Sequence, residues 1–126
     1  MDLPPNITLE PSDGQLTFTV SGPLLADDVI RVVKGCYTGF RGRRIMWNLS
    51  AADVSRVATD DFTRVAIAVR ASTPADVERK TAYVVTGQAA SVAFWKYLNQ
   101  AVRLHVPVEY QVFSDAAAAQ RWLERP

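Results

Sequence analysis

The 126-residue sequence contains few of the residues from which metal centres, disulfides and nucleophilic catalytic sites are built. It has a single cysteine, Cys36, and a single histidine, His105, which are far apart in sequence. One cysteine cannot close an intramolecular disulfide, and the two residues are too small a set for a metal site or for a Cys-His or Ser-His-Asp arrangement. We therefore expect a protein that is not an enzyme and that uses no metal and no cofactor.

Long apolar runs and an excess of one charge are also missing. No segment approaches the roughly 18 apolar residues of a membrane span, and the N-terminus lacks the basic and apolar regions of a secretory signal. Fourteen basic residues are balanced by thirteen acidic ones, which leaves a formal net charge of +1 and argues against a protein that neutralises a phosphate backbone. These absences predict a cytoplasmic protein without a membrane span or a nucleic-acid partner.

A glycine-rich phosphate-binding loop is absent as well. The segment 37–42 has two glycines, but it follows a predicted helix and precedes a predicted strand, which is the wrong side for a dinucleotide fingerprint. Arg41, Arg43 and Arg44 form the only basic cluster. They are interpreted as a solvated turn or as salt-bridge donors, with a docking surface for an acidic partner as the alternative.

Strand patterns are present along the whole chain. The central segment 43–50, RRIMWNLS, is an almost continuous apolar run, which is typical of a strand buried on both faces of a sheet. The segments 7–10 and 15–21 predict a hairpin, because apolar and polar residues alternate in the second of them. Apolar runs at 81–86 and 107–113 predict two further strands.

Helical spacing of apolar residues predicts four helices between and after these strands. The first runs from Leu25, on its buried stripe, to Cys36. The second covers 60–71 with Thr59 as its N-cap, the third covers 88–104, and a short fourth follows Ser114 and Asp115. This order predicts one α/β domain over residues 7–124, after a flexible tail at 1–6. Its sheet should have about five strands, mostly parallel, with an antiparallel N-terminal edge strand and four helices.

Polar residues collect where the middle strands of such a sheet should end. The carboxyl ends of parallel strands meet at one edge, and this edge is where open α/β sheets usually bind ligands or partners. Helix capping alone explains most of these residues, and a helix start after a glycine also offers free N–H groups to an anion. The candidate partner or ligand rim comprises Ser50, Asp53, Ser55, Thr59, Thr86, Gly87 and Gln88, with Ser91 beside them. An enzyme with a weak site at Ser50, Thr86 and Gln88 is the alternative interpretation.

The predicted third helix is unusually apolar. Phe94, Trp95 and Leu98 cannot all face the sheet from one helix, so they form a candidate apolar contact face for a protein partner or for a two-fold homodimer. The same pattern fits a deeply packed helix. A third explanation is a pocket between this helix and the sheet, lined by these residues and Tyr97, for a small or lipid-like ligand.

Three segments, IMWNLSAADVS, VVTGQAASVAFWKYL and VPVEYQVFSDAAAAQRWL, together resemble the SpoIIAA-like branch of the STAS and SEC14-like proteins, named after the anti-sigma factor antagonists of bacteria. The resemblance covers Ile7 to Leu123 and lies in the order of elements and in apolar patterns. It implies a five-stranded sheet with helices packed on it and no cofactor. It also implies a regulatory role in which the domain binds a protein partner or a small or lipid-like ligand.

The resemblance also concerns a phosphorylation switch. In the antagonists, a strand ending in Asp-Leu-Ser leads to an Asp-Ser-Ser-Gly-type turn whose serine is phosphorylated to release the partner. Here the segment 48–50 reads Asn-Leu-Ser, and the second motif is missing. Only Ser55 or Thr59 could replace the serine, and a phosphate on Thr59 would meet the carboxylates of Asp60 and Asp61. We therefore expect the switch to be lost.

Overall fold

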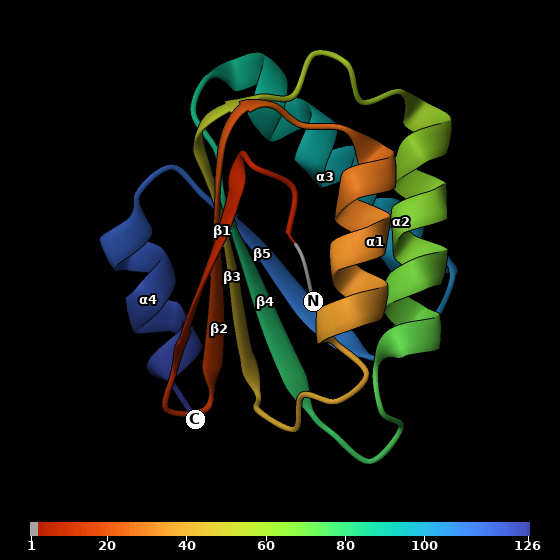
Figure 1. Ribbon diagram of the computed structural model, residues 1–126, viewed down its shortest axis with the longest axis vertical. Helices are drawn as coiled ribbons and strands as arrows, with labels where there is room; N and C mark the ends of the chain where they lie inside the picture. The colour runs from red at the N-terminus through yellow and green to blue at the C-terminus, as the bar shows by residue number, and fades with distance from the viewer. Residues whose placement is uncertain (1–2) are drawn as a thin grey trace.

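The structure, a computed structural model, describes residues 3–126 and is shown in Figure 1. Within these residues, strands and helices alternate after an initial hairpin. In chain order the elements are β1 (Ile7–Ser12), β2 (Gln15–Pro23), α1 (Ala26–Cys36), β3 (Arg44–Asp53), α2 (Thr59–Ser72), β4 (Arg79–Val84), α3 (Gln88–Arg103), β5 (Val108–Phe113) and α4 (Ala116–Glu124).

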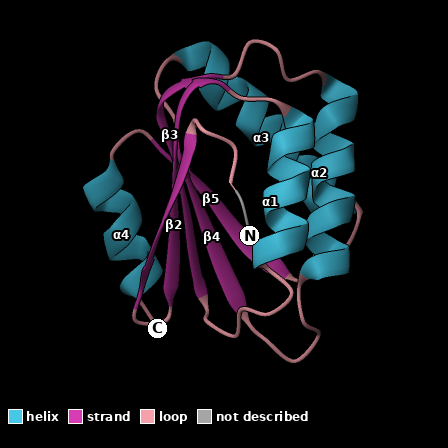
Figure 2. Cartoon of the chain, in the orientation of Figure 1, coloured by secondary structure: helices cyan, strands magenta, loops and turns pink. Residues whose placement is uncertain are grey.

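The strands form one sheet in the order β1-β2-β3-β4-β5. β1 and β2 pair antiparallel, and each later pair of neighbours is parallel. Helices α1, α2 and α3 cover one face of the sheet, and α4 lies on the other face (Figures 1 and 2). The predicted fold class is therefore confirmed, including the antiparallel edge strand at the N-terminus.

The middle of the central strand β3, residues 45–49, is buried or half-buried on both faces, as its apolar run predicts. Trp47 belongs to the core beneath α1, α2 and α3. Met46, its neighbour in sequence, belongs to a smaller core that α4 closes through Trp122 and Leu123. Successive side chains of a strand point to opposite faces, so a strand is mostly apolar along the part that helices cover on both sides.

The junction between β2 and α1 differs from the prediction. Leu25 is 44% exposed and precedes α1, whereas Leu24 is 4% exposed and lies in the core. β2 continues beside β3 as far as the pair Pro23–Asp53, and the Leu24 N–H then bonds to the Asp53 carbonyl at 2.9 Å. This extension turns Leu24 inward and leaves Leu25 outside.

Other strand bounds also shift. β3 extends three residues beyond the predicted end at Ser50, because residues 51–53 pair with residues 21–23 of β2. β4 begins and ends two residues earlier than the predicted 81–86, because its first residue, Arg79, already pairs with Val108 of β5. None of the helices in the described residues is both long and apolar enough to cross a membrane.

The segment 3–6 packs against the domain, whereas the sequence predicts a flexible tail there. Pro4 is buried, and its carbonyl accepts the Ile7 N–H at 3.0 Å. The Asn6 side-chain amide donates to the carbonyls of Ser21 at 3.0 Å and Pro23 at 2.7 Å. These bonds hold the chain against the end of β2. Residues 1–2 of the predicted tail lie outside the described residues.

Candidate functional site

The carboxyl ends of β3 and β4 meet at one edge of the sheet, where a hydrogen bond joins the two junctions. The hydroxyl of Thr86, which follows β4, donates to the Ser50 carbonyl in β3 at 3.1 Å. Ser50 also donates its N–H and its hydroxyl to Oδ1 of Asn48, at 3.1 Å and 2.7 Å. The structure thus brings Ser50 and Thr86 together, with both side chains exposed.

Asp53 and Ser55 form a local turn on the same rim. The Ser55 N–H donates to Oδ1 of Asp53 at 2.9 Å. Hydrogen bonds from the Ser55 hydroxyl and N–H hold the pKa of the Asp53 carboxyl below its usual range. Both residues are exposed, so this ionised carboxylate is accessible on the surface while its geometry is set by its neighbour.

The α3 start supplies the remaining rim residues, Gly87 and Gln88. Gly87 has φ +88°, a left-handed conformation that a residue with a Cβ rarely adopts, and it separates the end of β4 from α3. Its carbonyl accepts the Ser91 N–H at 3.1 Å, which completes the first helical turn. Gln88 is exposed as the first residue of α3.

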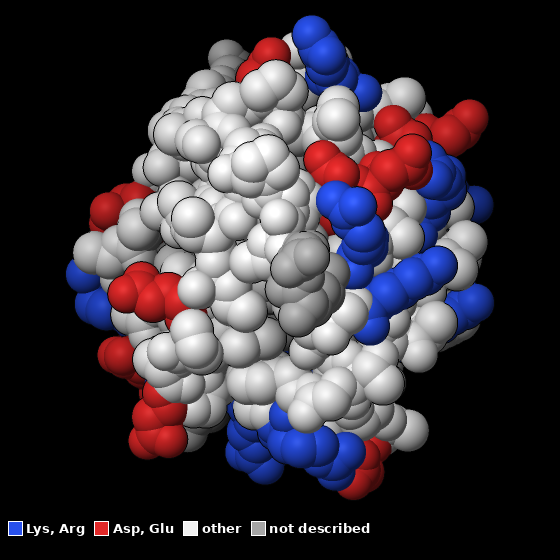
Figure 3. Space-filling model, in the orientation of Figure 1, with Lys and Arg blue, Asp and Glu red and all other residues white. Residues whose placement is uncertain are grey.

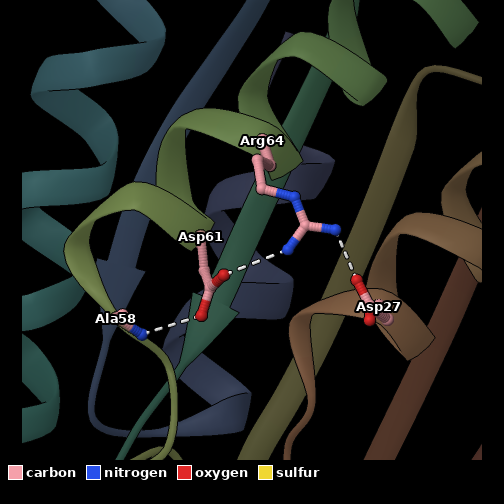
Figure 4. A network of polar contacts seen from close by, with 4 residues as sticks. All are labelled: Asp27, Ala58, Asp61 and Arg64. Carbon is pink, nitrogen blue, oxygen red and sulfur yellow. Dashed lines mark hydrogen bonds and ion pairs between the residues drawn. The ribbon is translucent and has the colours of Figure 1, made fainter.

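The start of α2 is anchored to α1 by an arginine (Figure 4). Ala58 is the N-cap, and its N–H donates to Oδ2 of Asp61 at 2.9 Å, so the predicted N-cap Thr59 is instead the first helical residue. Arg64 bonds to the other oxygen of Asp61 at 3.1 Å and to Asp27 of α1. The Asp27 carboxylate raises the pKa of Arg64. Asp61 thus supplies one half of a capping box, because it accepts the N–H of the N-cap residue, while Ala58 offers no side-chain acceptor to the helix.

A groove of about 380 Å³ runs between the start of α2 and the outer side of α3. We call it the α2–α3 groove. Its lining contains two basic side chains, Lys96 and Arg103, and no acidic residue among those that the structure describes. The remaining lining residues are Val57, Thr59, Phe62, Val92, Ala93 and Asn99.

Beside the α2–α3 groove, α3 exposes a tryptophan. Trp95 is 54% exposed, three residues from Val92 and four from Asn99, so it adjoins the groove on the helix surface. Phe94 and Leu98 are only 4% and 6% exposed, and the predicted contact face is therefore wrong for these two residues. They share the buried side of α3 because their spacing places them above the sheet.

The predicted ligand pocket between α3 and the sheet is filled by aromatic rings. Tyr83 and Phe94 have ring centres 5.2 Å apart, and Phe62 lies 5.7 Å from Phe94. The apolar cavity left among these rings measures about 30 Å³. Pockets for small organic ligands usually measure several hundred Å³. This space is therefore too small for the predicted ligand.

Arg79 is a buried cation that sequence analysis did not single out. It is 3% exposed, and its guanidinium donates to the carbonyls of Gly42 at 3.2 Å and Phe40 at 2.7 Å. Burial lowers the pKa of Arg79. Its Nη1 is buried without a hydrogen-bond partner. No signal in the sequence pointed to this, because the predicted strand begins at Thr81. In the structure β4 begins at Arg79, and the side chains of Arg79 and Thr81 point to the same covered face.

The remaining chemically notable residues do not assemble. His105 is exposed after α3 with φ +54°, and Cys36 is half-buried in α1, where burial raises the pKa of its thiol. Of the predicted basic cluster, Arg41 pairs with Asp76 at 2.5 Å and Arg44 donates to the Asp13 carbonyl at 2.6 Å. The described residues contain no group of three or more histidine, cysteine or acidic side chains placed to hold a metal ion.

No protein-family model and no curated protein matches the sequence. Among solved structures, the chain is similar to one described as "Crystal Structure Analysis of Mglu", with 12% sequence identity and a TM-score of 0.35. The match covers 82% of this chain and 19% of the other, so this chain spans about a fifth of that protein's length. A likeness at this level carries no argument about function, and the resemblance to the SpoIIAA-like branch stays a hypothesis.

Proposed function

We propose that this protein is a non-enzymatic regulatory domain that binds an acidic protein partner along the α2–α3 groove. The observation that carries the proposal is the exposure of Trp95, 54%, beside that groove. Tryptophan is enriched among the few residues that dominate binding energy at protein interfaces. Exposed Val92 and Val102 extend the apolar surface along the same helix.

Charge supports the acidic nature of the partner. Lys96 and Arg103 line the groove, and no acidic side chain of the described residues lines it with them. Complementary charges speed the encounter of two proteins and select against partners of the wrong sign. A second copy of this chain would present the same basic groove, so the charge pattern favours a different protein over a homodimer.

The start of α2 is formed without a phosphate, which supports binding without a phosphorylation switch. Arg64 links Asp61 to Asp27 of α1 through exposed ion pairs, which favour one geometry of the first turn of α2. Such preorganisation reduces the entropy lost on binding. The acidic residues in that turn oppose a further negative charge on Thr59. Binding is therefore constitutive in this proposal.

The test isolates the partner and then measures its affinity for matched variants. Tagged protein is used to capture the partner from the native host, and the purified partner is titrated calorimetrically. Trp95→Ala should weaken binding at least about tenfold, as expected for an interface hot spot. Ile67→Ala is the control, because Ile67 is also exposed, 45%, but does not line the groove.

Lys96→Glu provides the electrostatic arm of the same test. It should weaken binding and reduce its dependence on salt, because it reverses one of the two lining charges. Equal affinities of the wild type and Trp95→Ala would contradict the proposal. So would sedimentation showing a tight homodimer that Trp95→Ala dissociates, since the exposed face would then serve self-association.

A further inference from the structure

A second groove lies at the opposite end of the sheet, at the amino ends of β3 and β4. Its volume is about 680 Å³. We call it the amino-end groove. Its lining includes the glycines of two turns, Gly14 and Gly42, and the end of α4. Figure 3 shows basic side chains gathered at the lower end of the molecule, where Figure 1 places the amino ends of these strands.

The amino-end groove concentrates positive charge in a chain whose formal net charge is only +1. Two acidic side chains, Glu78 and Glu109, line it, and so does Pro126 with the α-carboxylate of this 126-residue chain. Against them stand five basic residues from several separate elements: Arg43, Arg44, Arg79, Lys80 and Arg125. The ion pairs found among the described residues involve none of these five side chains.

The contacts that these side chains do make leave their charge in place. Arg44 donates to the Asp13 carbonyl at 2.6 Å. Lys80 donates to the carbonyls of Trp122 at 3.3 Å and Arg125 at 2.9 Å. A carbonyl oxygen accepts a hydrogen bond but carries no net charge that could neutralise a cation. The amino-end groove therefore keeps a positive electrostatic potential, which attracts anions.

Arg79 provides an independent indication. It lines the groove and is 3% exposed, yet its Nη1 has no hydrogen-bond partner. Buried polar groups are nearly always satisfied, and a buried cation is costly unless an anion compensates it. The guanidinium lies 5.7 Å and 5.2 Å from the ring centres of Tyr37 and Phe40, but no acidic side chain of the described residues pairs with it. Its charge therefore adds to that of the other four cations and favours an anion in the groove.

We propose that the amino-end groove binds a phosphate-bearing small molecule. Its volume lies in the range of small-ligand sites. The planar guanidinium of arginine can donate two parallel hydrogen bonds to phosphate oxygens. The groove also has more cations than a ligand with one carboxylate would neutralise. The site lies at the other end of the strands from the rim, so it is independent of the proposed partner interface. Ligands of open α/β sheets usually bind at the carboxyl ends, and fold analogy alone therefore does not suggest this site.

The test uses inorganic pyrophosphate as the probe and two-dimensional amide NMR as the readout, at constant ionic strength. Saturable shifts are expected at Gly14, Gly42 and Arg44. The double variant Arg43→Gln/Arg125→Gln should raise the dissociation constant at least about tenfold, because charge-assisted hydrogen bonds are lost. Neither side chain makes a hydrogen bond or ion pair recorded in the structure, so the variant should fold.

The matched control is Lys96→Gln/Arg103→Gln, which removes two charges from the α2–α3 groove and should leave pyrophosphate binding unchanged. Arg79→Lys keeps the buried charge but removes the fork, and it should also weaken binding. If Arg79→Lys does not fold, the affinity of the double variant Arg43→Gln/Arg125→Gln for pyrophosphate tests the proposal. ADP is the second probe, and it distinguishes an organic from an inorganic phosphate ligand. Tighter binding of ADP than of pyrophosphate indicates an organic phosphate, and tighter binding of pyrophosphate indicates an inorganic one.

Three outcomes would overturn the proposal. The first is the absence of saturable shifts at the groove. The second is equal loss of affinity in the two double variants, which would indicate a response to overall charge. The third is that sodium chloride, added in place of pyrophosphate at the same ionic strength, shifts the same amide signals equally. This would indicate charge screening and not binding of pyrophosphate.

Discussion

The indole Nε1 of Trp47 donates a hydrogen bond to the hydroxyl of Tyr37 at 2.8 Å within the core. Trp47 is 2% exposed and Tyr37 is 1% exposed, so neither group has water as an alternative partner. The Trp47 ring also stacks on Phe18 with ring centres 4.4 Å apart. Through these contacts, the central strand β3 is joined to the neighbouring strand β2 and to the end of α1.

Trp47→Phe should destabilise the domain by about 1–3 kcal/mol, because it leaves the buried Tyr37 hydroxyl without its donor. Trp47→Ala should cost about 3–5 kcal/mol through the cavity it creates. Urea unfolding measures both values. Trp95→Phe, at the exposed tryptophan, is the control and should change stability by less than about 0.5 kcal/mol. An unchanged unfolding midpoint for Trp47→Ala would place this ring outside the core.

The folded domain should lose stability as the pH rises above about 10, the usual tyrosine pKa. Burial raises the pKa of each of the four tyrosines, Tyr37, Tyr83, Tyr97 and Tyr110. The unfolded chain then releases these protons first. The stability is therefore complete below that pH, and its loss continues until the pH passes the folded-state pKa values.

The slope of this loss should approach about 5 kcal/mol per pH unit once all four tyrosines ionise in the unfolded chain. Ultraviolet absorbance of tyrosinate, followed together with circular dichroism, checks the prediction. Tyrosinate should appear only as the fold is lost. Independent ionisation of a tyrosine near its usual pKa in the folded protein would contradict the prediction.

Gly42→Ala should destabilise the domain by about 1–3 kcal/mol through overpacking. A Cβ at this position would collide with the Phe40 ring and would lie 2.7 Å from the Gly14 carbonyl oxygen. The Arg79 guanidinium lies 5.2 Å from the centre of this ring, so moving the ring aside would disturb that contact. Gly39→Ala is the control, since nothing lies within 4 Å of its added Cβ. Equal thermal midpoints of the two variants would contradict the close approach.

Ala58→Ser should stabilise the domain by about 0.5–2 kcal/mol, because serine supplies the missing N-cap acceptor of α2. Ala58 has the extended conformation of an N-cap and makes no side-chain cap. Chemical denaturation measures the gain. Ala75→Ser, at an exposed residue outside the helices, should give no comparable change. Equal stability of the Ala58→Ser variant and the wild type would mean that Asp61 alone completes the cap.

Protein purified from its native host should carry no stoichiometric phosphate between Ser50 and Thr59. Ser55 adjoins the ionised carboxylate of Asp53, and Thr59 begins a helix whose first turn is acidic. A phosphate at either residue would be repelled by these like charges. Intact-mass measurement and peptide mapping provide the test. A predominant phosphorylated species at Ser55 or Thr59 would restore the antagonist mechanism.

The order of the elements and the burial of the middle of β3 on both faces follow from the amino-acid sequence. Periodicity of apolar residues is a property of short segments, and a strand or helix expresses it wherever the segment packs. The sequence also located the two junctions of the rim, because parallel strands place their carboxyl ends together. It did not decide the N-cap of α2, because the cap at Ala58 depends on the carboxylate of Asp61, three residues later.

The packing of the elements against one another determines which side chains remain exposed and which polar groups come together. Rotation of α3 on the sheet buries Phe94 and Leu98 and exposes Trp95, although all three are apolar. Arg79 meets the carbonyls of Phe40 and Gly42, which are 39 and 37 residues away in sequence. Such contacts depend on how neighbouring strands and helices pack, and no periodicity within one segment encodes that packing.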